Sequence, residues 1–171
     1  MTCKIHRLTA LLALLLFMVA FVASAKAQEA TILGEDQLKV VLPMSFYFEG
    51  RSGPTQSRNA AAVRFAEKRN VIVALIDTAG YSSDVREKYE GFLITDSAIT
   101  LGGKALSTGA YGFGVTKEGQ MNVFDIGGNL LFSVPAPKDT ALTAPRPLTI
   151  KKGADGFRIY RGRNFVALAA K

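Results

Sequence analysis

The segment "VIVALIDTAGY", residues 71 to 81, decides the fold that the sequence predicts. It begins with a continuous apolar run in which most residues are β-branched, and it then passes through Asp77 and Thr78 to Gly80. A short apolar run bounded by turn-forming residues is typical of a strand that is buried on both faces. Asp and Thr side chains can hydrogen-bond their own backbone where a chain turns. The segment therefore predicts a central strand over 71–76 and its exit over 77–81.

The rest of the chain consists largely of short apolar or alternating runs separated by turns. Residues 60–76 are typical of a hairpin with a polar turn at 67–70, and further strands are predicted over 92–95, 98–101, 110–116, 121–126, 130–134, 148–152, 157–160 and 165–169. Strands at roughly ten-residue spacing without long intervening helices favour antiparallel sheets. We therefore expect an all-β fold, a single-domain antiparallel β-sandwich or barrel of about ten short strands with at most one short helix.

Three other segments complete this expected layout. Residues 38–50 predict two strands interrupted at Pro43, because aromatic and polar residues alternate in its second half. Residues 51–59, "RSGPTQSRN", predict a turn-rich loop. Residues 79–91 predict the one short helix, in which Val85 and Tyr89 share a face.

The N-terminal residues have the three parts of a secretory signal peptide. A basic head is followed by an apolar stretch over 8–23 and by small residues that permit cleavage after Ala25 or, preferably, Ala27. The apolar stretch is shorter than the ~20 residues that span a bilayer, which favours cleavage over anchoring. We expect a signal peptide at 1–27, an N-terminal tail at 28–37 and the sandwich or barrel domain at 38–171, in a protein exported to the periplasm or the cell exterior.

The only cysteine and the only histidine, Cys3 and His6, lie within the predicted signal peptide. Without them, a mature chain cannot build Ser-His-Asp triads, Cys-His nucleophiles or the usual zinc and iron sites. The sequence also contains no Asp-x-Asp-x-Asp-Gly run of the kind that binds calcium. We therefore expect a non-catalytic protein that uses no metal and no cofactor.

Positive charge is concentrated at the C-terminal end of the chain. Residues 138–171 contain 8 basic and 2 acidic side chains, whereas residues 28–137 contain 10 basic and 12 acidic side chains. An asymmetry of this kind can indicate an anionic partner. It is also compatible with a solvated face that has no partner.

A predicted hairpin over 157–170 carries the candidate binding residues. Strand alternation places Phe157 and Ile159 inward and the residues between and after them outward or at the turn. Guanidinium groups bind phosphate and carboxylate groups in a bidentate manner. The candidate residues for an anionic partner, an envelope polymer or a lipid headgroup, are Arg158, Tyr160, Arg161 and Arg163, with Arg51 and Arg58 assisting. The open alternative is that these arginines only keep an edge strand soluble.

Residues 77–80, Asp-Thr-Ala-Gly, match a segment of small GTPases. Such an enzyme needs a preceding phosphate-binding loop that ends in Gly-Lys-Ser/Thr. The only Gly-Lys pair here follows the segment, and Ala105 stands where the magnesium-binding hydroxyl is required. We therefore expect no nucleotide, and the absence of a recognition module also disfavours nucleic acid.

The same segment resembles the Asp-Thr-Gly loop of retroviral-type aspartic peptidases. These enzymes work as dimers in which two Asp residues share a proton, so they need neither His nor Cys. In such an enzyme Asp77 would be the catalytic residue, and "FDIGGNLL", residues 124–131, loosely resembles the later motif. Ala79 departs from the family pattern, because it stands where the motif has a conformationally free glycine.

"AITLGGKALSTGAYGFGV", residues 98–115, resembles a hairpin of uncharacterised exported β-proteins of bacteria, and residues 81–95 and 124–142 are similar to the same group. The resemblance implies a bacterial envelope location and adds no specific activity. From all these features we expect an exported, non-catalytic β-domain that binds an anionic envelope component. The alternative is a dimeric aspartic peptidase that uses Asp77.

Overall fold

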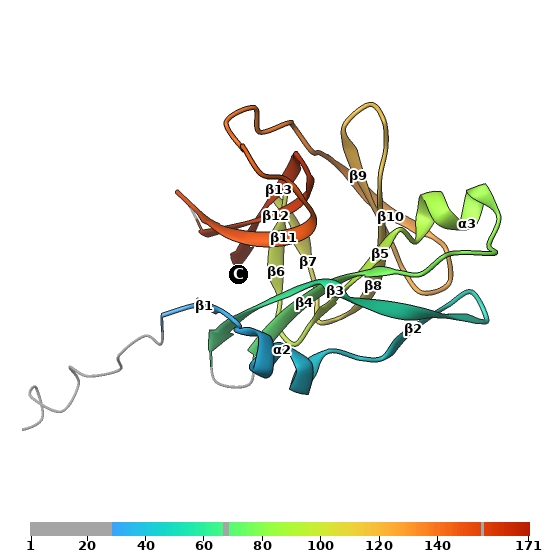
Figure 1. Ribbon diagram of the computed structural model, residues 1–171, viewed down its shortest axis with the longest axis horizontal. Helices are drawn as coiled ribbons and strands as arrows, with labels where there is room; N and C mark the ends of the chain where they lie inside the picture. Colours follow the sequence, from blue (N-terminus) through green and yellow to red (C-terminus); the bar gives the residue numbers. More distant parts are fainter. Residues whose placement is uncertain (1–28, 67–68, 155) are drawn as a thin grey trace, which may run out of the picture.

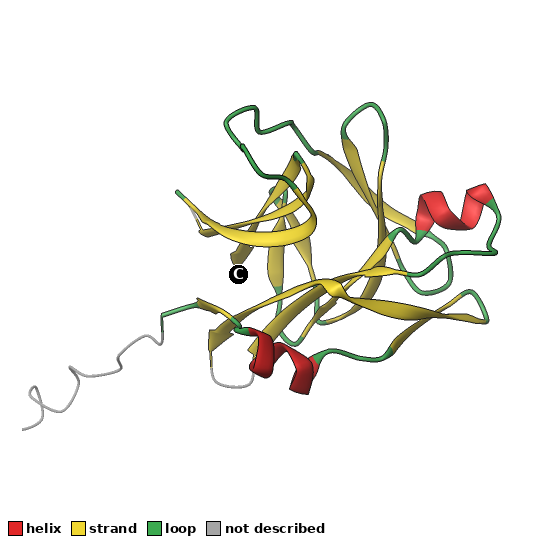
Figure 2. Ribbon diagram, in the orientation of Figure 1, coloured by secondary structure: helices red, strands yellow, loops and turns green. Residues whose placement is uncertain are grey.

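The computed structural model describes residues 29–66, 69–154 and 156–171. They form two antiparallel sheets that pack in a sandwich-like manner, together with two short helices (Figure 1; Figure 2). The predicted all-β fold class is confirmed. The predicted signal peptide, residues 1–27, lies outside the described residues.

The strands divide unequally between the two sheets. Within the described chain, the large sheet contains β1 (Thr31–Ile32), β2 (Ser45–Phe48), β3 (Arg51–Ala66), β4 (Arg69–Ile76), β5 (Gly91–Thr95), β8 (Gly109–Val115), β9 (Gln120–Phe124) and β10 (Leu130–Pro135). The small sheet contains β6 (Ile99–Leu101), β7 (Lys104–Leu106), β11 (Arg146–Gly153), β12 (Gly156–Gly162) and β13 (Asn164–Ala170). The helices are α2 (Glu35–Val41) and α3 (Ser83–Lys88).

The order of the large sheet is β1-β3-β4-β5-β8-β9-β10, with β2 also paired to β3, and the order of the small sheet is β11-β12-β13-β6-β7. Between β5 and β8 the chain therefore leaves the large sheet to form the β6–β7 hairpin, and Leu101 pairs with Leu168 of β13. Gly102 and Gly103 form the turn of this hairpin with φ angles of 56° and 80°. The Gly-Gly-Lys segment is thus a tight turn between two short strands.

Strand β4 is central, as its sequence predicts. Every residue from Val71 to Ile76 is buried, and Asp77 beyond the end of the strand is exposed. Val71, Val73 and Leu75 belong to one hydrophobic core, and the residues between and after them belong to another. A strand with an apolar layer on each face needs a continuous apolar run, which explains why this segment lacks alternation.

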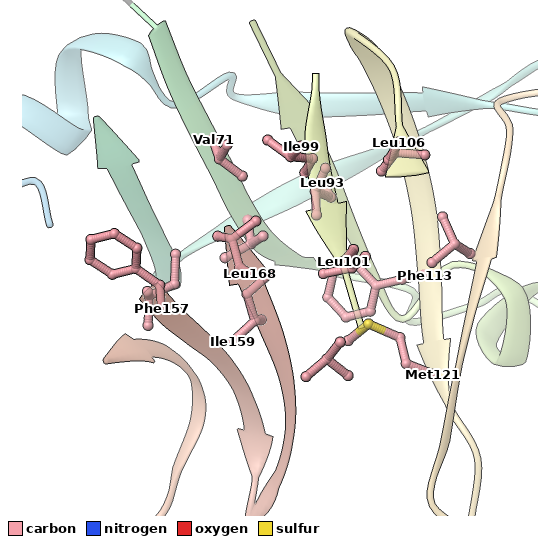
Figure 3. Packing of buried hydrophobic residues seen from close by; sticks show 14 of the residues in the cluster. Val71, Leu93, Ile99, Leu101, Leu106, Phe113, Met121, Phe157, Ile159 and Leu168 are labelled. Atoms are coloured by element: carbon pink, nitrogen blue, oxygen red, sulfur yellow. The ribbon is translucent and has the colours of Figure 1, made fainter. Parts of the chain in front are cut away.

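The first core fills the space between the two sheets. Figure 3 shows side chains from the large sheet, such as Leu93 and Phe113, converging with Phe157, Ile159 and Leu168 from the small sheet. Most of these side chains are completely or almost completely buried. This layer fixes the inward face of the C-terminal hairpin.

The second core lies on the opposite face of the large sheet. The β2–β3 hairpin, α2 and α3 all contribute side chains to this core. Figure 1 shows α2 on the side of the large sheet that faces away from the small sheet. Aromatic side chains of this core stack on one another. The rings of Phe46 and Phe92 have centroids 4.9 Å apart, and those of Phe48 and Tyr89 are 4.5 Å apart. Gly112 makes room for the Tyr89 ring, because a Cβ atom there would overlap the ring carbons.

The predicted strand at 38–42 is wrong, because α2 occupies most of this segment. The apolar residues of this segment have a helical spacing: Leu38, Val41 and Leu42 all pack against the second core, whereas Val40 is 85% exposed. The segment 28–37, expected as a tail, contains β1 and the start of α2, and it contributes buried Leu33 to this core.

The predicted loop at 51–59 is also wrong, because these residues form the first part of β3. Gly53 permits β3 to cross close to Ile76, whose side chain would overlap any added Cβ atom. The Pro54 carbonyl accepts a hydrogen bond from the Asp77 N–H at 2.8 Å. A large register shift between Thr55 and Ala60 then accommodates the remaining polar residues as a bulge.

Candidate functional site

In the C-terminal hairpin, β12 and β13, residues of β12 alternate between the inner and outer faces of the small sheet as the sequence predicts. Phe157 and Ile159 are buried in the first core, while Arg158 and Tyr160 lie on the outer face of the small sheet. Arg161 follows on the inner side at the end of β12. The candidate residues therefore belong to one hairpin but do not share one surface.

Tyr160 lies on the outer face, but its side chain is covered. The residue is 4% exposed, and its phenol donates a hydrogen bond to Asp139 Oδ2 at 2.8 Å. This hydrogen bond holds the pKa of the Asp139 carboxyl group below its usual range. Because its hydroxyl already has a partner and its ring is buried, Tyr160 offers an anionic partner no free donor, and its ring lies beneath Lys151 within the fold.

Arg161 and Arg163 also have partners within the fold. Arg161 Nε donates to Glu90 Oε1 at 2.7 Å, its Nη2 forms an ion pair with the same carboxylate, and its Nη1 donates to the Pro147 carbonyl at 3.2 Å. Arg163 Nη1 donates to the Leu142 carbonyl. Arg161 thus links the small sheet to the residue that precedes β5 of the large sheet.

Arg158 remains directed to the outer surface with Lys151 beside it. The two residues are direct partners on β12 and β11. The Arg158 guanidinium lies 4.4 Å from the centre of the Phe165 ring, and Lys151 Nζ lies 5.7 Å from the centre of the Tyr160 ring. We call these residues, Lys151, Arg158, Tyr160 and Phe165, the cation–aromatic face.

Sequence reasoning missed Lys151 and Phe165 as members of this face. Lys151 lies on a strand that is separate in sequence from the predicted hairpin, and only the register of β11 with β12 places it opposite Arg158. The sequence predicts a strand over 165–169 but does not define which way Phe165 faces. Strand alternation could have placed Phe165 beside Tyr160, since the two face each other across the turn.

Arg51 and Arg58, the proposed assisting residues, lie on β3 of the large sheet. The Arg51 guanidinium is 6.0 Å from the centre of the Tyr81 ring, and the Tyr81 hydroxyl donates to the Ser52 carbonyl at 3.0 Å. Arg51 therefore borders the exit of β4 and is not part of the cation–aromatic face.

The exit of β4 has the geometry of a side-chain-supported turn. Asp77 Oδ1 accepts a hydrogen bond from the Ala79 N–H at 3.1 Å, and Gly80 has a φ angle of 87°. Residues 124–131, which resemble the later peptidase motif, begin at the end of β9, and β5 and β8 separate β9 from β4 in the sheet. Within one chain the two motif-like segments are therefore not neighbours in the sheet.

A polar cavity opens where β3, β4, α3, β8 and the small sheet meet. Its volume is about 570 Å³. It is lined by Gln56, Asn59, Leu75, Ile76, Thr78, Ser83, Arg86, Glu87, Glu90, Gly114, Val115, Pro147 and Arg161, and we call it the sheet-end cleft. No local sequence pattern predicts this cavity, because its lining comes from many separate segments.

Metal ligation finds no support in the part of the chain that the structure describes, where no three His, Cys, Asp or Glu residues are grouped. Over the same ranges, none of the helices has the length and apolar character needed to cross a membrane. The fold and its surfaces define an all-β, sandwich-like domain with a cationic patch on the outer face of its smaller sheet. Comparisons with protein-family models, curated proteins and solved structures find no match to this chain.

Proposed function

We propose that the protein is an exported, non-catalytic binding domain that contacts phosphate or carboxylate groups of an anionic envelope component through its cation–aromatic face. The observation that carries this proposal is the pairing of Arg158 and Lys151 on one open sheet face. Neither side chain forms an ion pair with another residue of the described ranges. Both cations therefore keep hydrogen-bond donors for a partner.

The aromatic rings support this function by positioning the cations. A guanidinium that stacks on a ring keeps its N–H donors at its edge, where a planar oxyanion can meet two of them. Stacking on Phe165 also reduces the conformational freedom that Arg158 loses on binding. The positive charge of Arg158 contributes to lowering the pKa of the nearby Asp139 carboxyl group. The Asp139 carboxylate in turn reduces the local positive charge of the face. The net contribution of the face is therefore moderate, and binding should be sensitive to salt.

The C-terminal charge asymmetry and the signal-like N-terminal sequence support an anionic partner in the cell envelope. An envelope polymer and a lipid headgroup present the same phosphate or carboxylate chemistry. The test therefore uses two probes, vesicles of phosphatidylglycerol mixed with phosphatidylcholine and soluble polyphosphate.

The test compares the protein with a double variant, Lys151→Gln and Arg158→Gln, at low and physiological salt. We expect the double substitution to weaken binding to at least one probe by about tenfold at low salt and to flatten its salt dependence. The matched control, Arg69→Gln with Lys117→Gln, removes the same two residue types from the large-sheet side and should leave binding nearly unchanged. Equal loss in both variants would show a nonspecific charge effect, and no binding to either probe would refute the proposal.

A further inference from the structure

The sheet-end cleft is a second surface with its own chemistry, separate from the cation–aromatic face. Its walls come from both sheets and from α3, and the ion pair between Arg161 and Glu90 crosses from one sheet to the other beside it. Glu90 Oε2 also accepts a hydrogen bond from the Val115 N–H at 3.3 Å. These bonds hold three parts of the cleft wall together without using the cleft's remaining polar groups.

Two carboxamide side chains on the β3 bulge are already oriented within the cleft. Gln56 Nε2 donates to the Ile76 carbonyl at 3.2 Å, and Asn59 Nδ2 donates to Gln56 Oε1 at 2.8 Å. Each amide nitrogen retains a second N–H, and Asn59 Oδ1 remains an acceptor. A prearranged donor and acceptor pair of this kind matches the N–H and C=O groups of a peptide backbone.

Two opposite charges lie next to each other on the helical wall of the cleft. Arg86 and Glu87 belong to α3, and neither forms an ion pair with any other residue of the described chain. Since Arg161 and Glu90 neutralise each other, Arg86 and Glu87 are the charges left for a ligand. The lining has no net formal charge, which disfavours a polyanion, and it contains no aromatic side chain on which a sugar ring could stack.

We propose that the sheet-end cleft binds the backbone of a short zwitterionic peptide. Gln56 and Asn59 bind its peptide groups, Arg86 pairs with its terminal carboxylate, and Glu87 pairs with its terminal ammonium group. The recognition is directed at the backbone and the chain ends, so it depends little on the peptide's side chains. The location of the site follows the usual occurrence of ligand sites in concave surfaces with a few convergent polar groups.

The test is a titration of the isotope-labelled protein with tetraalanine, followed by NMR. We expect the amide signals of residues around the β3 bulge and the start of α3 to shift in a saturable manner. Arg86→Gln and Glu87→Gln should each weaken binding by about fivefold. Both side chains are exposed, so these variants should remain folded, and Arg69→Gln outside the cleft serves as the control.

Capped peptides separate the two charge contacts. Tetraalanine amidated at its C-terminus should be insensitive to Arg86→Gln, and N-acetylated tetraalanine should be insensitive to Glu87→Gln. The proposal is overturned if tetraalanine causes no saturable shifts, if the shifts lie outside the cleft, or if the doubly capped peptide binds equally well. Since Lys151 and Arg158 lie outside this cleft, their substitution should leave tetraalanine binding intact, so failure here is distinguishable from failure of the proposed function.

Discussion

The large and the small sheet differ in the number of faces that are covered. The large sheet has an apolar core on each side, so its central strand β4 exposes none of the residues from Val71 to Ile76. The small sheet packs on the first core with one face, and its other face carries Lys151, Arg158 and Phe165 at least partly in solvent. Side chains on a doubly covered sheet are constrained by packing, whereas those on an open face are free to serve a partner.

This difference also explains where the candidate function lies. An open sheet face does not need cations for stability, and positive residues are not required to fill any space there. The basic side chains of the small sheet therefore have a weaker structural explanation than the apolar residues of the large sheet. Substitutions that compare the two sheets directly can test this interpretation.

The largest effect is expected for Phe92→Ala in the large sheet. Phe92 is fully buried and stacks on Phe46 at 4.9 Å, so the substitution should lower the free energy of unfolding by about 3–5 kcal/mol. The matched substitution on the small sheet, Phe165→Ala, removes a ring that is only partly buried, and it should cost clearly less. Denaturant unfolding of both variants measures the difference. Equal losses would mean that the outer face of the small sheet is as tightly packed as the second core.

The sequence predicted the core of the large sheet more successfully than its cover. A short apolar run rich in β-branched residues and followed by turn-forming residues is typical of a buried strand, so β4 was predictable from residues 71–81. The elements that cover it were not predicted, because α2 and the first part of β3 depend on distant contacts. Leu38 gains its partners only when the second core forms, and Gly53 lets β3 pass close to Ile76, where a Cβ atom would clash. In these segments, tertiary packing determined the secondary structure more strongly than the local sequence pattern did.

The candidate site was predicted only in part, because local strand geometry can be read from the sequence whereas contacts with distant segments cannot. Alternation correctly placed Arg158 and Tyr160 outward, because it depends only on local strand geometry. The partners of Arg161 and Tyr160, Glu90 and Asp139, lie far away in sequence, so no local pattern could show that these side chains were already engaged. Strand register, which places Lys151 opposite Arg158, is equally inaccessible from a single segment.

The next largest loss of stability is expected on removing the Tyr89 hydroxyl group inside the second core. Tyr89 is fully buried, and its hydroxyl donates to the Asp125 carbonyl at 2.9 Å. Tyr89→Phe should cost about 1–2 kcal/mol, because the carbonyl loses its partner. Burial, followed by the negative charges of Glu49 and Asp125, raises the pKa of Tyr89 to about 12.

Because of this raised pKa, the free energy of unfolding is expected to depend on pH in the alkaline range. The folded state favours the neutral phenol, so the stabilisation is complete below the unfolded pKa of about 10 and is lost as the pH rises toward 12. Unfolding measured between these values should be less pH-dependent in Tyr89→Phe than in the unchanged protein. Tyr47→Phe is the control, since Tyr47 is 59% exposed. If both variants behave alike, the hydroxyl of Tyr89 is not protected from solvent.

A smaller effect is expected where the two sheets meet. The Arg161 and Glu90 side chains are 31% and 28% exposed, so solvent screens their interaction in part. A double-mutant cycle with Arg161→Gln and Glu90→Gln should give a coupling of about 1 kcal/mol that decreases with added salt. A coupling near zero would mean that the first core alone determines how the sheets are joined at this end.

The smallest effect is expected for Lys151→Gln, which tests the comparison within a single strand. Lys151 is exposed on β11, whereas its neighbour Ile150 is 4% exposed and faces the first core. The lysine contributes at most a weak contact with the Tyr160 ring, so its loss should change the free energy of unfolding by less than about 0.5 kcal/mol. Ile150→Ala should cost about 2–5 kcal/mol because it leaves a cavity between the sheets. Denaturant unfolding of the two variants therefore distinguishes a face held by packing from one that is free to bind, and a large loss for Lys151→Gln would show that the cation has a structural role after all.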